Sequence, residues 1–327
     1  MSRLPEPRLI EVGEADTETW RAIAAAAGHA TWFHTFEWAD LWCLPGVTTQ
    51  PRGLLFRFDD GAEALVPATC HASKGGLVRA YTSSATGKYG GWIARTEIGA
   101  AHVRAIAAHL ATLDLTLRQN PFAPHGDLME WTREDFTQAL DVTRGYDAIL
   151  AGWSGNHRSS LARARKKGVA VASARSVGAW REYDAIYRDS LRRWGSKAQS
   201  VVPWDVFERL AATPSDAVRL WLARHEGRAV AGAVCFSHGT HTVYWHGAAL
   251  ESAFDVRPVH ALFDAILEDA ASRGLHWFDF NPSGGLPGVV RFKDGFGCVR
   301  LPANVYEASR RMTRVLRRVG RAVRRAG

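Results

Sequence analysis

The residues with the clearest chemical potential lie in FDFNPSGGLPGVVRFKDGFG, which spans residues 278–297. This stretch places one lysine, Lys293, between Phe292 and Phe296, after a loop rich in glycine and proline. An ammonium group in apolar surroundings interacts strongly with nearby negative charge, because the local dielectric constant is low. Lys293 is therefore a candidate catalytic residue that would stabilise negative charge, such as an oxyanion, on a bound substrate.

Lys293 and its neighbour also have plainer interpretations. Lys293 could be an exposed cation paired with Asp294 or Glu307, since lysines are rarely buried. Phe292 could stack on a nucleotide base or simply fill the core. The position of the ammonium group, beside a cleft or in bulk solvent, decides between these interpretations.

Polar residues at the start of this stretch belong to a predicted strand, HWFDF (276–280), and to the loop after it. Asp279 alternates with aromatic residues and is a candidate to accept the proton of an attacking amine, or to cap a neighbouring backbone group. Asn281 and Ser283 follow the strand, and ligands of open sheets commonly bind at such strand ends. We therefore expect both to bind substrate.

A second group of candidate substrate-binding residues precedes this stretch. In YWHGAAL, period-two alternation predicts Tyr244 and His246 on one face of a strand and Trp245 on the other. Tyr244 is expected to form a wall of the acyl pocket. Arg193 and Trp194 end a predicted helix, where the guanidinium group could bind a carboxylate or phosphate of the acceptor, or cap the helix.

Several other motifs are incomplete. ATGKYG (85–90) lacks the upstream glycine of a phosphate-binding loop and the serine or threonine after its lysine. RKKGVA (165–170) matches the Arg-x-x-Gly-x-Ala loop that binds coenzyme A, yet it is predicted to end a helix, whereas such loops open one. The histidines and cysteines lack metal-binding spacing, and no G-x-S-x-G elbow occurs. We therefore expect no metal, no covalent nucleophile and no cofactor besides the acyl donor.

Basic residues are concentrated in two segments. The formal net charge is +8, and residues 308–327 contain eight arginines and no acidic residue. That segment also has apolar residues at helical spacing, which predicts an amphipathic helix that packs on the protein or lies on a membrane surface. A second basic run covers 157–167, which could be a solvated helix face. Alternatively, both segments could contact a polyanion such as RNA or anionic lipid. The candidate residues are Arg158, Arg163, Arg165, Lys166, Lys167, Arg310, Arg311, Arg314, Arg317 and Arg318.

The predicted elements indicate an α/β protein of the α+β type. A chain of 327 residues can form two domains. Without a signal-like or membrane-spanning apolar run, and with isolated cysteines, it is expected to be cytoplasmic. Periodicity predicts helices near 17–28, 33–42, 98–114, 178–194, 203–212 and 258–273, and strands or hairpins at 52–72, 113–119, 219–250 and 276–280.

Several stretches together resemble the FemABX group of GNAT-fold transferases, which transfer an amino acid from aminoacyl-tRNA to an amine. The resemblance extends over about residues 85–300, and its most specific part is the Phe292-Lys293 pair before Gly295-Phe296-Gly297. The matching stretches are YGGW (89–92), SGNHRSSLARARKKGV (154–169), LRRWGS (191–196), AVAGAVCF (229–236), YWHGAAL (244–250), RPVHALFDAILEDAASRG (257–274) and the Lys293 stretch itself.

The resemblance implies two tandem GNAT-like domains, each a mixed, mostly antiparallel sheet flanked by helices. We expect them at residues 1–140 and 141–305, with a basic C-terminal helix at 306–327. Trp38 and Tyr89 of the first domain complete the expected set of substrate-binding residues.

The implied activity is aminoacyl-tRNA-dependent transfer to an amine of a small molecule, peptide or peptidoglycan precursor, with formation of an amide bond. The helical-hairpin arm with which some members of the group bind tRNA has no room here, so the donor stays open. An acyl-CoA-dependent N-acyltransferase is the alternative, although ESAFDVRPVH (251–260) replaces the Arg-x-x-Gly-x-Gly loop expected after the 243–250 strand. A third possibility is a non-catalytic RNA- or membrane-binding protein with this fold.

Overall fold

The computed structural model describes residues 6–73, 78–195, 201–213 and 215–308. The chain folds into two compact units. Unit 1 comprises the described residues up to 136 together with 302–308, and unit 2 comprises those of 137–301.

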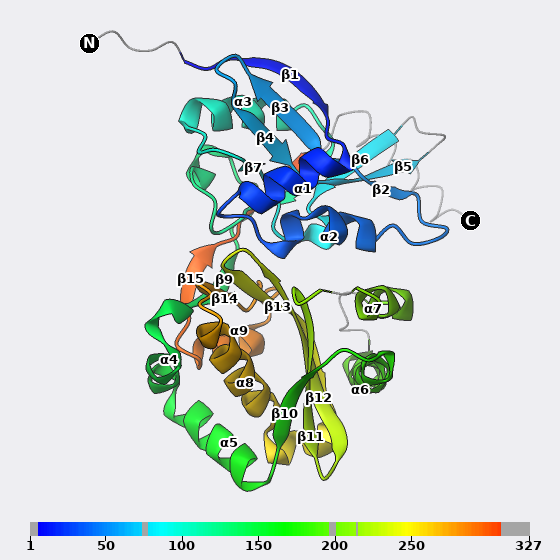
Figure 1. The fold of residues 1–327 in the computed structure, drawn as a ribbon, viewed down its shortest axis with the longest axis vertical. Coiled ribbons are helices and arrows are strands. Elements are labelled where there is room, and N and C mark those ends of the chain that lie inside the picture. The colour runs from blue at the N-terminus through cyan, green and yellow to red at the C-terminus, as the bar shows by residue number, and fades with distance from the viewer. Residues whose placement is uncertain (1–5, 74–77, 196–200, 214, 309–327) are drawn as a thin grey trace, which may run out of the picture. The chain divides into compact units, whose positions relative to one another are not determined.

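Unit 1 contains two sheets among its described residues (Figure 1). The strand orders are β1-β3-β4-β7 and β16-β8-β6-β5-β2, and within the second sheet β6 and β8 run parallel. The elements are β1 (Leu9–Glu14), α1 (Thr17–Ala26), η1 (Trp32–His34), α2 (Phe36–Leu41), β2 (Thr49–Pro51), β3 (Leu54–Phe58), β4 (Glu63–Val66), β5 (Thr69–Ser73), β6 (Val78–Ser83), η2 (Ala85–Gly87), β7 (Ile93–Ala94), α3 (Ala100–Leu110), β8 (Leu115–Arg118), η3 (Gly126–Leu128) and β16 (Val305–Ala308).

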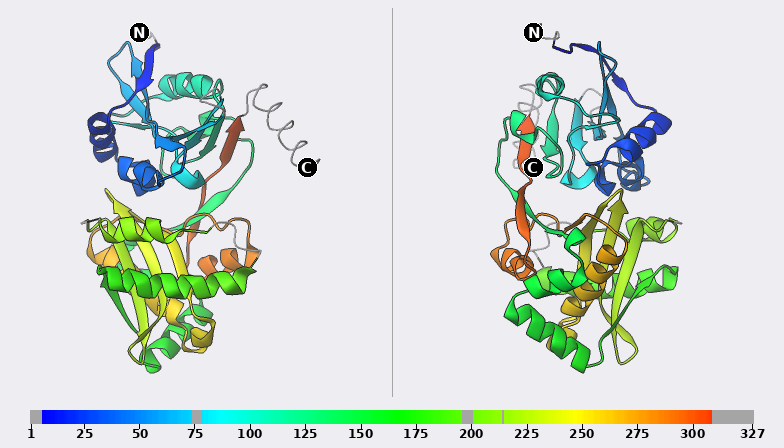
Figure 2. Two further views of the ribbon diagram at one scale, coloured as in Figure 1. Left: turned by 90° about the vertical axis from the view of Figure 1, so that its right-hand side faces the viewer. Right: turned by 60° about the vertical axis from the view of Figure 1, so that its left-hand side comes forward.

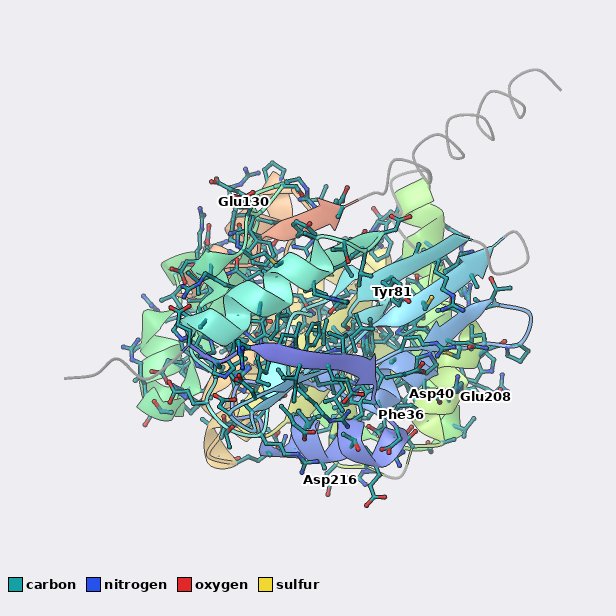
Figure 3. All side chains as sticks on the ribbon, turned by 90° about the horizontal axis from the view of Figure 1, so that it is seen from above. Phe36, Asp40, Tyr81, Glu130, Glu208 and Asp216 are labelled. Atoms are coloured by element: carbon teal, nitrogen blue, oxygen red, sulfur yellow. The ribbon has the colours of Figure 1, made fainter. Side chains whose placement is uncertain are left out.

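The first helices of unit 1 form where side chains cap them and apolar residues recur at helical spacing. The Asp16 carboxylate accepts a hydrogen bond from the Thr19 backbone N–H at 2.7 Å and so begins α1. Trp20 and Ile23 then face the core, one turn apart. The Trp20 ring packs edge-on against Phe36 of α2, with ring centroids 5.6 Å apart. Figure 3 labels Phe36 among the side chains of the described residues.

The last described strand completes the second sheet of unit 1. β16 pairs antiparallel with β8, with Val305 opposite Arg118. The residues just before β16 also bond to the end of β8. Arg118 donates to the carbonyl oxygen of Ala303 at 3.0 Å, and the Gln119 N–H donates to the carbonyl oxygen of Asn304 at 2.7 Å. Unit 1 is therefore assembled from two segments that are far apart in the sequence.

This strand corrects one prediction. A helix was expected from residue 306, but residues 306–308 lie in β16. Pairing with β8 satisfies their backbone groups, which local helical periodicity does not reveal. The rest of the predicted helix, 309–327, lies outside the described residues.

Unit 2 is built on a sheet with the order β10-β11-β12-β13-β14-β9-β15. α4, α5 and α8 lie on one face of this sheet and α6 and α7 on the other (Figures 1 and 2). The elements are β9 (Phe136–Asp141), η4 (Val142–Arg144), α4 (Tyr146–Gly152), α5 (Gly155–Lys166), β10 (Ala170–Ala174), α6 (Val177–Trp194), α7 (Trp204–Ala211), β11 (Val218–His225), β12 (Arg228–His238), β13 (His241–Ala249), η6 (Glu251–Val256), α8 (Pro258–Ser272), β14 (Trp277–Asp279), α9 (Pro287–Asp294) and β15 (Val299–Pro302).

β13 and β14 are parallel neighbours over a short distance only. Their pairing runs from His241 opposite Trp277 to Val243 opposite Asp279. Beyond these residues β13 continues to Ala249, whereas β14 ends. The pairing between these two interior strands therefore ends at Val243 and Asp279.

A β-bulge interrupts the pairing of β12 with β13. Val234 lies opposite His246, but Cys235 lies opposite Tyr244, so Trp245 is an additional residue on β13. An extra residue of this kind breaks the alternation of side chains between the two faces of a strand.

The bulge overturns the expectation that Tyr244 and His246 share a face. The Tyr244 ring packs against Phe263 of α8, with centroids 5.0 Å apart. The His246 ring packs against Tyr187 of α6 at 4.5 Å, on the opposite face of the sheet. The period-two prediction is wrong here because it assumes a strand without bulges.

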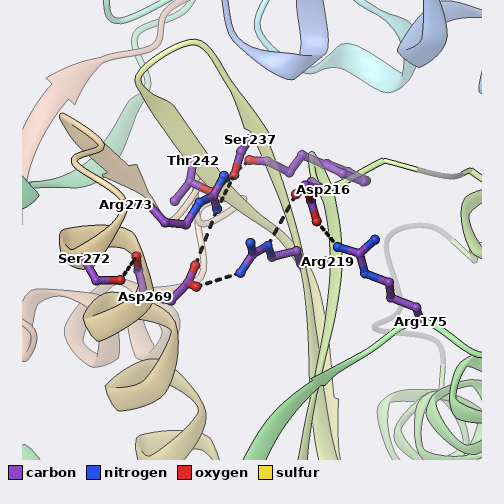
Figure 4. A network of polar contacts seen from close by, with 9 residues as sticks. Arg175, Asp216, Arg219, Ser237, Thr242, Asp269, Ser272 and Arg273 are labelled. Atoms are coloured by element: carbon purple, nitrogen blue, oxygen red, sulfur yellow. Dashed lines mark hydrogen bonds and ion pairs between the residues drawn. The ribbon is translucent and has the colours of Figure 1, made fainter.

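A polar network fixes the C-terminal end of α8 to the sheet (Figure 4). Asp269 accepts hydrogen bonds from Arg219 of β11 at 2.6 Å and from Arg273 at 3.4 Å. Arg273 also donates to the hydroxyl of Ser237 at 3.3 Å, and that hydroxyl lies 2.7 Å from the hydroxyl of Thr242. One carboxylate thus links a helix to two strands.

We predict that Asp269→Ala destabilises unit 2 by about 1–3 kcal/mol, because it removes the carboxylate that two partly buried guanidinium groups share as an acceptor. Asp216→Ala is the matched control, since its ion pair with Arg175 is exposed and should contribute under about 1 kcal/mol. Urea unfolding followed by circular dichroism measures both. Equal midpoints for the two variants would contradict the assignment of Asp269 as the anchor.

Candidate functional site

Two adjoining cavities lie in unit 2, on the face of the sheet that α8 covers. Their volumes are about 270 and 200 Å³, and Tyr244, Val259 and Phe263 line both. We call the two together the cleft. The larger cavity is also lined by Phe280, Gly288, Val289, Phe292 and Lys293, and the smaller one by Arg193, Trp194, Gly232, Ala233, Gly247, Ala248, Ala249, Phe254 and Leu262.

Lys293 lies in the last turn of α9, and its side chain borders the larger cavity. Only 5% of the residue's surface is exposed, and Nζ donates a hydrogen bond of 2.6 Å to the carbonyl oxygen of Asn281. Asp294, its neighbour, instead accepts hydrogen bonds from Arg300 and Gln138. The interpretation of Lys293 as an exposed cation paired with Asp294 or Glu307 is therefore wrong.

The carbonyl group that holds Lys293 is fixed by its own residue. Asn281 has a φ of 60°, in the left-handed region, and its side-chain amide donates to the carbonyl oxygen of Tyr244 at 2.6 Å. Its backbone N–H donates to Asp279 at 3.0 Å, and the same carboxylate oxygen accepts from the Thr137 hydroxyl at 2.5 Å. Asp279 thus orients the turn that presents the Asn281 carbonyl to Lys293.

A residue that the sequence analysis did not identify joins this turn to α9. Gln138 of β9 is fully buried, and its amide nitrogen donates to the carbonyl oxygen of Val290 at 2.9 Å and to Asp294 at 2.6 Å. Its amide oxygen accepts from Ser283 at 3.1 Å. Ser283 therefore supports the site indirectly, because it contacts Gln138 and does not line the cleft.

Two buried histidines lie behind Phe292. The rings of His157 and His260 are 4.8 Å apart, and His157 Nε2 donates to the carbonyl oxygen of Phe292 at 2.9 Å. His157 Nδ1 and both nitrogens of His260 have no hydrogen-bond partner among the described residues. A side chain at Gly295 would meet the His157 ring at 2.3 Å, so this glycine is required for the close packing.

Burial controls the charge of this pair. It lowers the pKa of His260 to about 4, and repulsion by His157 and Arg257 adds to the effect. Burial also lowers the pKa of His157, although its hydrogen bond to Phe292 opposes the shift. Both rings are therefore neutral near pH 7 and act as part of the aromatic wall beside the cleft.

Of the remaining predicted substrate-binding residues in unit 2, two line the cleft and one does not. Arg193 and Trp194 line the smaller cavity, where the Arg193 guanidinium lies 4.9 Å from the Phe254 ring and donates to the carbonyl oxygen of Ala249 at 3.3 Å. His246, in contrast, packs among the rings of α6 and α7 and does not line the cleft.

Trp38 and Tyr89 lie in unit 1, whereas the cleft lies in unit 2. Both rings are fully buried, and both pack against Phe33, at 4.9 and 5.7 Å between centroids.

The basic run on α5 is largely engaged in internal contacts. Arg158 donates to the carbonyl oxygen of Ala151 at 3.1 Å, and Arg165 pairs with Asp264 at 2.9 Å. Arg163 approaches Asp255 at 4.0 Å, while Lys166 and Lys167 are exposed. The five predicted tail contacts, Arg310, Arg311, Arg314, Arg317 and Arg318, lie outside the described residues.

Comparison with known proteins agrees with this architecture. Residues 155–294 match the family described as an acetyltransferase (GNAT) domain. The crystal structure of FemX superposes with a TM-score of 0.67 at 12% identity, covering 91% of this chain and 96% of that one. The chain has a FemX-like fold, and the match to the acetyltransferase (GNAT) domain lies in unit 2. As expected, the fold is α/β with two units whose sheets are flanked by helices, although unit 1 has two sheets among its described residues where one was expected.

Two further solved structures share the FemX-like fold. A conserved protein of unknown function from Bacteroides thetaiotaomicron has a TM-score of 0.52 at 11% identity, with 90% of this chain and 97% of that chain covered. The structure of L-PGS from Bacillus licheniformis has a TM-score of 0.50 at 13% identity, with 84% and 89% covered. No curated protein is significantly similar in sequence.

The described residues contain no group of three or more His, Cys, Asp or Glu side chains that could hold a metal ion. No described helix is long and apolar enough to cross a bilayer.

We predict that the stability of unit 2 falls as the pH drops from about 6.5 towards 4. In this range the unfolded His260 binds a proton, whereas the folded residue, with its pKa near 4, does not. His260→Phe should make the decline smaller, since no hydrogen bond is lost. Thermal unfolding at pH 7.5, 5.5 and 4.5 tests this, with His225→Phe at the end of β11 as the control. An unchanged pH dependence in His260→Phe would exclude the buried histidine as its source.

Proposed function

We propose that this protein transfers an aminoacyl group from aminoacyl-tRNA to the amine of a small molecule, peptide or peptidoglycan precursor. The observation that carries the proposal is the burial of the Lys293 ammonium group at the wall of an apolar cavity. Burying an ammonium group without good compensation is costly. A position that directs it towards a cleft fits a group whose task is to stabilise developing negative charge there.

The proposed reaction requires little from the protein besides placement. The amine nitrogen attacks the ester carbonyl carbon, and the carbonyl oxygen becomes anionic in the tetrahedral intermediate. When the C–O bond breaks, the amide forms and the ribose oxygen leaves with a proton. Because the ester is already activated, proximity and relief of charge are the main contributions needed.

Each proposed residue has a part in this scheme. Lys293 stabilises the oxyanion or the leaving oxygen, and Phe292 excludes water beside it. Asp279 is the proposed acceptor of the amine proton, and its hydrogen bond from Asn281 also fixes the carbonyl that orients Lys293. Tyr244 forms part of the wall of the acyl pocket.

A coenzyme A thioester is the second candidate donor, because the matched family is described as an acetyltransferase domain. The connection from β13 to α8 favours the first candidate. It is a 3₁₀ helix with two acids, Glu251 and Asp255, and α8 opens with Pro258, which lacks an N–H. Repulsion by the acids and the missing donor both weaken a pyrophosphate site at this helix N-terminus.

The other candidate coenzyme A loop also has unsuitable geometry. α5 ends at Lys166, and Gly168 adopts a φ of 72° before β10 begins. The Val169 N–H returns to the carbonyl oxygen of Ala164 at 3.1 Å, which is a helix C-terminal cap. RKKGVA therefore follows the negative end of a helix dipole, which repels phosphate.

We predict that Lys293→Met lowers kcat by roughly 100- to 1,000-fold, the effect of removing one oxyanion-stabilising group. Methionine keeps an unbranched apolar side chain at the cavity wall. Arg291→Met is the matched control, since Arg291 lies on the same helix and is exposed. Amide formation would be measured with a pool of charged tRNA and a mixture of candidate amines. Full turnover by a folded Lys293→Met protein would refute the catalytic role of Lys293. Absence of turnover in the unsubstituted protein would instead favour a binding protein.

The donor can be tested by comparing charged tRNA with acetyl-CoA in thermal shift and transfer assays. We expect charged tRNA to raise the melting temperature and to be deacylated, with acetyl-CoA inactive. Removing residues 309–327, which hold eight arginines, should weaken tRNA binding and reduce its salt dependence, because fewer counterions are released. Turnover of acetyl-CoA alone would replace tRNA by coenzyme A as the donor.

A further inference from the structure

We infer that the cleft accepts an uncharged, apolar acyl chain, and that Val259 limits the size of this chain. The inference rests on the proposed acyl transfer and names the class of acyl group transferred. It comes from the chemistry and dimensions of the lining residues, described below.

The lining is almost entirely apolar. In the larger cavity, Lys293 is the one charged side chain among the described lining residues, and the others are aromatic, valine or glycine. The smaller cavity adds Arg193, whose cation already stacks on Phe254. No Asp or Glu belongs to the described lining of either cavity.

This charge pattern selects against charged acyl chains. A cationic chain would lose its hydration and meet Lys293 or Arg193 without a carboxylate partner. An anionic chain would also lose its hydration in the apolar lining, which can cost more than its pairing with Lys293 returns, and this pairing would neutralise the ammonium group that the oxyanion needs. An apolar chain has neither effect and gains free energy from leaving water.

The volume of the larger cavity fits part of a donor and not the whole molecule. The larger cavity measures about 270 Å³, which is below the range of roughly 300–1,000 Å³ usual for sites that enclose drug-sized ligands. It therefore suits an acyl chain, with the bulk of the donor outside. Val289 and Phe254, one in each lining, are 36% and 42% exposed, so apolar surface remains for a chain to cover.

Val259 is the position where the size of the chain can be set. It lies in the first turn of α8, is half-buried and borders both cavities. A larger side chain there narrows the cleft, and a smaller one widens it. Gly288 offers a second position, because a Cβ added to this lining residue meets nothing within 4 Å.

The test measures binding of four small amides to the full chain by NMR titration. These are hexanamide, acetamide, the cation 6-aminohexanamide and the anion adipamate. We expect hexanamide to bind at least tenfold more tightly than the other three. Val259→Phe should weaken hexanamide at least tenfold, and Gly288→Leu should do so independently if Val259→Phe fails to fold. Val259→Ala should extend binding to octanamide.

Val177→Phe and Val177→Ala are the matched controls, since Val177 is an exposed valine in the first turn of α6. Both substitutions should leave the affinity for every amide unchanged. Equal or tighter binding of a charged amide would overturn the inference. So would indifference of the amide affinities to both Val259 and Gly288.

A separate assay distinguishes the inference from the proposed function. tRNA charged with leucine, phenylalanine, aspartate or lysine would be incubated with the protein and hydroxylamine, and hydroxamate formation measured. Leucyl and phenylalanyl transfer at least tenfold above the charged residues supports the inference. A preference for aspartate or lysine overturns it while aminoacyl transfer stands. Apolar amide binding without transfer from any donor keeps the inference and rejects the proposed function.

Discussion

The site depends on one interaction, the hydrogen bond from the Lys293 ammonium group to the carbonyl oxygen of Asn281. A buried ammonium group must be compensated, and here a backbone carbonyl compensates it without forming part of the lining of the cleft. The left-handed conformation of Asn281 turns that carbonyl towards Lys293. Asn281 can adopt this conformation because asparagine tolerates it better than most residues do.

The same interaction requires two elements to stay in register. Lys293 belongs to α9, and Asn281 follows β14. Gln138, from a third element, accepts from Ser283 on one side and donates to Val290 and Asp294 on the other. The distance between helix and turn is therefore set by one amide side chain that is completely buried, where water does not compete for its hydrogen bonds.

Local patterns in the sequence predict this site only in part. The aromatic neighbours drew attention to Lys293, and the FemABX resemblance favoured a catalytic role over that of an exposed cation; the residue is buried at the wall of the cleft. The helix that carries it, α9, was not predicted, since Pro287 and Gly288 are typical of a loop. Pro287 in fact occupies the first turn of α9, where its missing N–H has no partner to lose. Local composition therefore misrepresents the backbone here, although the lysine that it draws attention to does border the cleft.

Features that depend on pairing between distant segments were beyond local patterns. The bulge at Trp245 reverses the side on which His246 lies, and it is defined only by the register with β12. Gln138 gains its role from contacts with residues about 150 positions later in the chain. Helices such as α1, α6 and α8 were predicted closely, because their apolar spacing and caps are local properties.

The return of β16 to the sheet of unit 1 has a consequence for biosynthesis. On the ribosome, the N-terminal residues emerge first, but the edge of this sheet beside β8 has no partner until the last strand has left the exit tunnel. An unpaired edge strand readily binds other strands. The β8 edge of this sheet therefore stays unpaired while unit 2 is synthesised. During that interval a chaperone that covers the edge would contribute most.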